Sequence, residues 1–221
     1  LHIEQDPRLE EKNASLGIVE SIGGFEPFHI IVRGVANHAG TTPMSERADA
    51  LVAASKMIGT FPTLIKDFEE DGTVLTVGSL NVSPNGKNVI PDYVHFTIDL
   101  RSHTAHALHD ATERVLRFIE LHNTEQLHVT IEHLFSFQPK RLSISLQQQL
   151  LRAADVRRYS TLQLKSRAGH DAMTFASYVP TALLFVPSKD GISHAKEEWT
   201  DFEDIAKGTN VLYDVVSELT R

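Results

Sequence analysis

The sequence predicts a chain of mixed class, in which a discontinuous α/β domain is interrupted by a smaller α+β domain. Between residues 25 and 135 the strand and helix patterns follow the order β-α-β-β-α-β, which is the ferredoxin-like, or split βαβ, plan. Residues 144–219 alternate between helix and strand patterns, as α/β domains do. With 221 residues the chain is long enough for two units. We therefore expect an α/β domain from residues 1–23 and 137–221, and an inserted domain over 24–136.

The inserted domain begins with FEPFHIIVRG at 25–34, which is rich in β-branched and aromatic residues and stops at Gly34. Apolar residues then recur at three- and four-residue steps from 45 to about 61, which predicts an amphipathic helix that Gly59 and Pro62 help to end. The other predicted elements are strands at 73–82 and 92–101, a helix capped by Thr104, and a strand at 127–135.

The flanking segments supply the α/β pattern. LHIEQ at 1–5 reads as a strand that enters a turn. The later predicted elements are a helix at 144–155, a strand at 161–164, a helix at 171–178, a buried strand at 180–187 and a helix at 201–219. The connection from 153 to 162 is short, and Arg157 and Arg158 stand where a glycine would end a helix more easily.

Composition excludes several classes of function. The net charge is −8 and no stretch gathers Lys and Arg, so the basic footprint of nucleic-acid binding is missing. The longest apolar run, Ala182 to Val186, is far too short to span a membrane. The absence of cysteine fits a reducing, cytoplasmic location and leaves only His and carboxylates as metal ligands. Because the chain starts within a strand pattern and without Met, we expect a fragment.

The chain contains 12 histidines, most of which have an ordinary structural explanation. His103, His106 and His109 fit a solvated helix start, and the histidines within strand patterns have no companions that suggest a metal site. His194 is different, because it follows a buried strand at the end where α/β sheets place ligands. For His2, spacing alone leaves both a ligand and a structural role open.

Six segments in order carry a specific resemblance. They are LHIEQ (1–5), ANHAGTTPM (36–44), GKNVIP (86–91), FTIDLRS (96–102), AGHDAM (168–173) and FVPSKDGISHAKEE (185–198). Together they closely resemble the hydantoinase/carbamoylase family of dinuclear-metal amidases, which includes N-carbamoyl-L-amino acid hydrolase, allantoate amidohydrolase and β-ureidopropionase. The resemblance implies an aminopeptidase-like catalytic domain, a ferredoxin-like lid that also forms a homodimer, and a small substrate that bears a carboxylate.

The resemblance also implies roles for individual residues. His2 and His194 would each bind one of two divalent ions, Zn or Mn, with Co and Ni as alternatives. His38 would stabilise the oxyanion from the partner subunit's lid, so that it is both catalytic and substrate-binding. Asn88 and Arg101 would clamp the substrate carboxylate from one end of the sheet. The remaining metal ligands and a catalytic Glu would lie upstream of LHIEQ, so we expect the isolated chain to be inactive.

Two positions depart from the family pattern. Asp6 stands where a glycine is expected after LHIEQ, and Arg167 replaces the first glycine of an SGAGH segment in which Gly169 and His170 are expected to contact substrate. Arg167 could reshape that pocket or be a harmless variant.

Two other functions stay open for the protein: an aminoacylase or dipeptidase of the same superfamily, and a non-catalytic dimerisation module.

Overall fold

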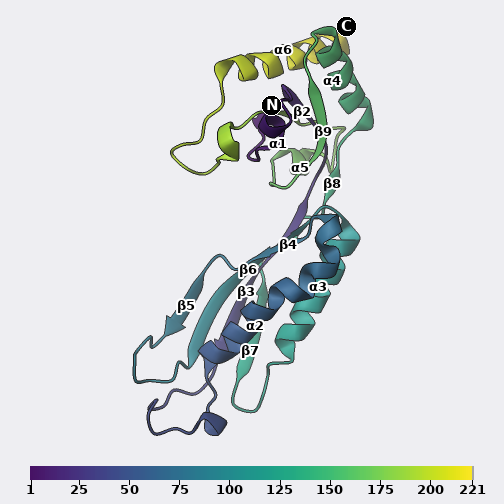
Figure 1. Ribbon diagram of the computed structural model, residues 1–221. Helices are drawn as coiled ribbons and strands as arrows, with labels where there is room; N and C mark the ends of the chain where they lie inside the picture. Colours follow the sequence, from purple (N-terminus) through teal and green to yellow (C-terminus); the bar gives the residue numbers. More distant parts are fainter. Residues whose placement is uncertain (221) are drawn as a thin grey trace. The chain divides into compact units, whose positions relative to one another are not determined.

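The computed structural model describes residues 1–220 and divides the chain into two compact units. The first unit joins Leu1–Gly23 to the part of the chain from Pro139 onward, and the second unit is Gly24–Gln138. Each unit contains its own five-stranded sheet (Figure 1). Within residues 1–220, no helix is both long and apolar enough to cross a membrane.

The second unit has the predicted order of elements. Its strands run β4-β6-β3-β7, every pair is antiparallel, and β5 also pairs with β6. Two helices connect the strands, as in the split βαβ arrangement. The elements are β3 (Gly24–Arg33), α2 (Ala50–Ile65), β4 (Val74–Thr76), β5 (Leu80–Ser83), β6 (Tyr93–Ser102), α3 (Ala105–Glu120) and β7 (His128–His133), with 3₁₀ turns at Met44–Glu46 and Lys66–Asp71.

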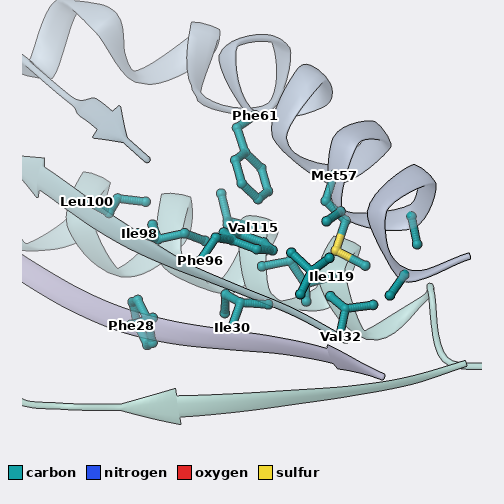
Figure 2. Close-up of a cluster of buried hydrophobic side chains, with 14 of the residues drawn as sticks. Phe28, Ile30, Val32, Met57, Phe61, Phe96, Ile98, Leu100, Val115 and Ile119 are labelled. Atoms are coloured by element: carbon teal, nitrogen blue, oxygen red, sulfur yellow. The ribbon is translucent and has the colours of Figure 1, made fainter. Parts of the chain in front are cut away.

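The core of the second unit lies between one face of its sheet and the two helices. Along β6 every second residue is buried, because successive side chains point to opposite faces of a strand. Figure 2 shows the buried side chains of β3 and β6 directed toward those of α2 and α3. They include Phe28, Ile30, Val32, Met57, Phe61, Phe96, Ile98, Leu100, Val115 and Ile119. The opposite face of the sheet is only half-buried and carries Arg101.

Two elements of this unit differ from the sequence prediction. The strand expected at 73–82 is two short strands, because the register with β6 is interrupted between them: Thr76 pairs with Asp99 and Leu80 pairs with Phe96, so residues 77–79 lie opposite only two residues of β6. The helix expected to end near Phe61 continues to Ile65, although it contains Pro62. Leu64 and Ile65 pack against the core, and this burial outweighs the helix-breaking tendency of proline.

The first unit is an α/β layer with mixed strand directions. Its sheet order is β1-β10-β2-β8, and β9 also pairs with β2. The predicted helix at 171–178 and strand at 180–187 are both shorter than expected. The strand keeps only its fully buried residues, whereas the helix buries Met173 alone and has little packing to extend it. The elements are β1 (His2–Ile3), α1 (Arg8–Glu11), β2 (Leu16–Ile22), β8 (Lys140–Arg141), α4 (Ile144–Val156), β9 (Thr161–Ser166), α5 (Ala172–Phe175), β10 (Leu184–Val186), a 3₁₀ turn at Lys189–Gly191 and α6 (Phe202–Leu219).

The short connection after α4 is closed by a Schellman motif. Tyr159 N donates to Ala154 O at 3.0 Å, and Arg158 N donates to Asp155 O at 2.8 Å. Arg158 adopts the left-handed conformation, with φ at 59°, which glycine reaches at lower cost. Arg157 binds both carboxylate oxygens of Asp214 on α6, at 2.6 and 2.9 Å. The short connection, which lacked the glycine expected at a helix end, is thus a regular helix end in which Arg158 takes the position that glycine usually occupies.

Changing Arg158 to Gly is expected to raise the free energy of unfolding by about 0.5–1 kcal/mol. The substitution relieves the strain of a left-handed backbone, and little packing is lost because the Arg158 side chain is exposed. Urea unfolding measures the difference. The matched control is Arg152→Gly, in the exposed middle of α4, which should lower the free energy of unfolding by about 1 kcal/mol. A loss of stability in Arg158→Gly would contradict the argument.

Candidate active site

One surface pocket of the first unit gathers two of the predicted metal ligands. β1 and β10 run parallel, with His2 opposite Phe185 and Ile3 opposite Val186. Their carboxyl ends therefore lead into loops at the same edge of the sheet, where α/β folds build sites. The pocket has a volume of about 580 Å³ and is lined by His2, Ile3, Gln5, His194 and Glu198.

The loop that carries His194 is held by a carboxylate. His194 has a left-handed backbone, with φ at 58°, and its N–H donates to Glu198 Oε2 at 3.0 Å. The same oxygen accepts a hydrogen bond from Ser193 Oγ at 2.8 Å, and Gln5 Nε2 donates to Ser193 Oγ at 2.8 Å. These hydrogen bonds lower the pKa of Glu198. Hydrogen bonds thus connect the loop after β10 to the turn after β1. The sequence contained no signal that Glu198 would accept the hydrogen bonds that hold this loop.

His2 is oriented by its neighbours. Its Nδ1 lies 2.8 Å from Ile3 O and donates to it, so in the neutral ring the lone pair is on Nε2. The His170 ring packs edge-on against it, with ring centroids 4.7 Å apart. A hydrogen bond from one ring nitrogen to a backbone carbonyl is the usual support for a metal-binding histidine.

His170 is held as a neutral ring. Ser166 Oγ donates to Ala168 O at 2.9 Å, so it accepts the hydrogen bond from His170 Nε2 at 3.0 Å. Burial, followed by the nearby His2, lowers the pKa of His170 to about 4. Gly169 lies beside His170 in the loop between β9 and α5, and neither residue lines the pocket. The expectation that both contact substrate therefore stays a prediction.

The residues present do not complete a metal site. A catalytic divalent ion needs about three protein ligands and an open position for water. Within residues 1–220, no three side chains of His, Cys, Asp or Glu converge in a way that could hold a metal ion. His2 and His194 share a pocket, and the tautomer of His2 suits a ligand, but two imidazoles are too few. Any dinuclear centre would need ligands from outside these residues.

His38 and Asn88 lie together in the second unit, beyond the end of β3 and before β6. Ala39 N donates to Asn88 O at 2.9 Å, and His38 forms an isolated bridge with Val89. Gly40 N donates to His38 Nδ1 at 3.0 Å, which leaves the proton of a neutral ring on Nε2. Arg47 fastens this loop by donating to Ala39 O at 2.5 Å and to Thr42 O at 3.0 Å.

Arg101 lies at the opposite end of the same sheet, which corrects the expectation that it and Asn88 share one end. Asn88 precedes the start of β6 at Tyr93, whereas Arg101 is next to its last residue. Tyr93 and Arg101 are eight residue steps apart along this extended strand, or about 27 Å. In Figure 1 the loop after β3 lies at the lower end of this unit, and β4, which pairs with Arg101, lies at the other end. Within the second unit of one chain, Asn88 and Arg101 are therefore too far apart to bind the same substrate carboxylate.

The surroundings of Arg101 include groups that the sequence analysis did not identify. Asp99 accepts hydrogen bonds from Arg101 Nε at 2.9 Å and Nη2 at 2.7 Å. The guanidinium lies over the Phe25 ring, 5.4 Å from its centroid. Phe135 and Phe137 pack against Phe25, with centroid distances of 5.9 and 5.1 Å, and both are exposed. The alternation in Phe135-Ser136-Phe137 was the available signal for this aromatic cluster.

The histidines expected to be structural are placed as expected only in part: His103 is half-buried, and two strand histidines that the sequence pattern left without companions contact each other. His106 is exposed on α3 and lies 3.4 Å from Asp110. His29 and His95 pack edge-on against each other on the half-buried face of the sheet. Neither arrangement includes the ligands of a metal site.

Changing Glu198 to Ala is expected to raise the hydrogen-exchange rate of the His194 amide by at least tenfold, because that N–H loses its acceptor in an exposed loop. Exchange monitored by NMR at neutral pH measures it. Glu197→Ala is the matched control, because its carboxylate contacts only the side chain of Lys196 among the described residues. Equal exchange rates in the two variants would show that Glu198 does not hold the loop.

Comparisons with known proteins extend over nearly the whole chain. The model of a family described as peptidase family M20/M25/M40 matches residues 1–218. The N-carbamoyl-L-amino-acid amidohydrolase of Paenarthrobacter aurescens is 38% identical over 222 residues, which cover 100% of this chain and 54% of the relative. The allantoate amidohydrolase of Bacillus subtilis (strain 168) is 34% identical, with 99% and 53% covered.

Among solved structures, an amidase of the hydantoinase/carbamoylase family from Burkholderia vietnamiensis has a TM-score of 0.89 and 34% identity. The match covers 97% of this chain and 52% of that chain. The chain thus spans about half the length of the curated relatives it matches.

Proposed function

Because this chain belongs to peptidase family M20/M25/M40, we propose that it is the part of a metal-dependent amidohydrolase that follows the first half of the catalytic domain. The complete protein hydrolyses the ureido or amide C–N bond of N-carbamoyl-L-amino acids. The observation that carries the proposal is the pocket that is lined by His2 from strand β1 and by His194 from the loop after β10. The relatives named above, which are amidohydrolases, support the same class of reaction.

The environment of Arg101 favours an N-carbamoyl amino acid over allantoate. Arg101 offers its outer guanidinium edge to a substrate carboxylate, because Asp99 already occupies Nε and one Nη2 proton. Beside it, Phe25 and the exposed Phe137 provide an apolar surface. An N-carbamoyl amino acid with a large apolar side chain uses both features, whereas allantoate has a second ureido group in place of that side chain.

The separation of His38 from Arg101 supports a homodimer. In the proposed enzyme, His38 and Asn88 of one subunit act on the substrate that Arg101 of the other subunit holds. His38 donates its Nε2–H to the oxygen on which charge develops, and Asn88 donates to the substrate carboxylate. Residues 1–220 contain no group of three ligands that could hold a divalent ion for activating water, so we expect the chain to be inactive alone.

The test compares the 221-residue chain with the complete protein, each with added Zn²⁺ or Mn²⁺. The complete protein should hydrolyse N-carbamoyl-L-methionine, and the chain alone should show no turnover. Preference for N-acetyl-L-methionine would indicate an aminoacylase, and preference for allantoate would overturn the argument from the aromatic cluster. A complete protein that dimerises but hydrolyses none of the three would be a non-catalytic dimerisation module.

A further inference from the structure

Asp6 and Arg167, which lie far apart in the sequence, are side by side in the first unit. Arg167 Nη1 is 3.6 Å from Asp6 Oδ2. Asp6 directly follows Gln5 of the pocket, and Arg167 precedes Ala168, Gly169 and His170. The exposed fraction of the side chain is 15% for Asp6 and 71% for Arg167. The carboxylate is therefore held within the surface, and the guanidinium reaches it from another loop.

Asp6 belongs to a charged cluster in which one arginine serves two carboxylates. Arg8 Nε lies 3.2 Å from Asp6 Oδ2 and 3.2 Å from Glu4 Oε1, and Arg8 Nη2 donates to Lys165 O at 3.2 Å. Glu4 is buried, and its Oε2 accepts a hydrogen bond from Leu9 N at 2.8 Å. Glu4 is held by the Leu9 N–H and by Arg8, and Arg8 is held by Glu4 and by the Lys165 carbonyl. Arg8 therefore neutralises Asp6 only in part, because its positive charge also neutralises Glu4.

Charge balance explains why Asp6 needs Arg167. Without these two residues, the cluster contains one carboxylate, Glu4, and one guanidinium, Arg8. Asp6 adds a second acid beside a buried one, which is unfavourable unless a second cation is present. Arg167 is that cation. We infer that Asp6 and Arg167 act as one positioning pair, which fastens the loop of Gly169 and His170 to the turn that follows β1.

The pair acts through His170, since neither Asp6 nor Arg167 lines the pocket. The His170 ring lies against His2, with centroids 4.7 Å apart, and is held from the other side by Ser166. A loop that moves away from the β1 turn would move His170 away from His2. Its effect on substrate binding rests on the proposed function, but its effect on the His170 ring does not.

The experiment is a double-mutant cycle with Asp6→Gly, Arg167→Gly and the double variant. In the chain itself, NMR signals of the His170 ring, assigned with a His170→Gln variant, should shift in each single variant and shift no further in the double variant, because either substitution already removes the pair. In the complete protein, KM for N-carbamoyl-L-methionine should rise by about three- to fivefold in each single variant and by the same factor in the double. Arg167→Lys retains the charge and should stay within twofold of the original. Asp6→Asn removes the charge without adding the backbone freedom of glycine, and it should raise KM as Asp6→Gly does.

The matched control is the same cycle on Asp67 and Arg114, an ion pair of the second unit with a distance of 2.7 Å. Alanine at either position should leave the His170 signals and KM unchanged. If the effects of Asp6→Gly and Arg167→Gly simply add in the double variant, the pairing is overturned. If the complete protein hydrolyses no substrate, the proposed function fails, and the His170 signals still decide the pairing.

Discussion

Replacing His38 with Ala in the complete protein is expected to lower kcat by about 10²–10³-fold and to change KM far less. The Gly40 N–H occupies His38 Nδ1 at 3.0 Å, so the direction of the Nε2–H is set before substrate binds. Such a preorganised donor stabilises charge that appears only in the transition state, and its loss therefore appears in kcat. His128→Ala is the control, because His128 is an exposed histidine of β7 in the same unit. A fall in kcat of less than threefold would show that His38 does not stabilise the transition state.

Mixing subunits tests whether His38 acts across the dimer. A His38→Ala subunit and a His194→Ala subunit should each be nearly inactive when alone. After subunit exchange, the heterodimer has one site that receives both an intact His38 and an intact His194. The mixture should therefore regain activity, up to about one quarter of the original when exchange is statistical, because half of the dimers each contain one working site. If verified heterodimers are no more active than their parents, His38 serves the site of its own subunit.

The sequence was sufficient for the order of elements in the second unit, because the buried positions of β3, β6 and α3 recur with the periods of strands and helices. It was insufficient where tertiary contacts prevail over local propensity. Pro62 did not end α2, since Leu64 and Ile65 gain burial by remaining helical. Arg158 took the place of a glycine because the Schellman hydrogen bonds offset the strain of its left-handed backbone.

The candidate site, like the fold, was predictable from the sequence only in part. The position after a buried strand drew attention to His194, whereas His2 was selected only by the family resemblance. The parallel pairing of β1 with β10 brings both to one pocket, and their binding of metal stays a prediction. Placing Asn88 relative to Arg101 required the length of β6, and the expectation of a shared end was wrong because β6 runs the length of the sheet. Contacts between segments far apart in sequence, such as Asp6 with Arg167, have no periodic signal. They follow from the fold and not from any local pattern.

Changing Arg101 to Lys is expected to raise KM of the complete protein about 30-fold, which corresponds to about 2 kcal/mol of binding, with a smaller change in kcat. The guanidinium has two hydrogen-bonding edges. Asp99 occupies the edge formed by Nε and Nη2, at 2.9 and 2.7 Å, and thereby orients the other edge for a substrate carboxylate. A lysine ammonium has no second edge, so Asp99 and the substrate would compete for the same three protons.

Steady-state kinetics with N-carbamoyl-L-methionine measures the effect, and Arg114→Lys provides the control. Arg114 binds Asp67 at 2.7 Å and lies over the Phe68 ring, so the same substitution alters a similar ion pair that the proposed mechanism does not use. Its KM should be unchanged. The carboxylate clamp also predicts that the amide analogue of the substrate, which lacks the negative charge, binds the original protein and Arg101→Lys about equally. If Arg101→Lys raises KM for the amide as much as for the carboxylate, then Arg101 supports the structure of the sheet and does not bind the substrate.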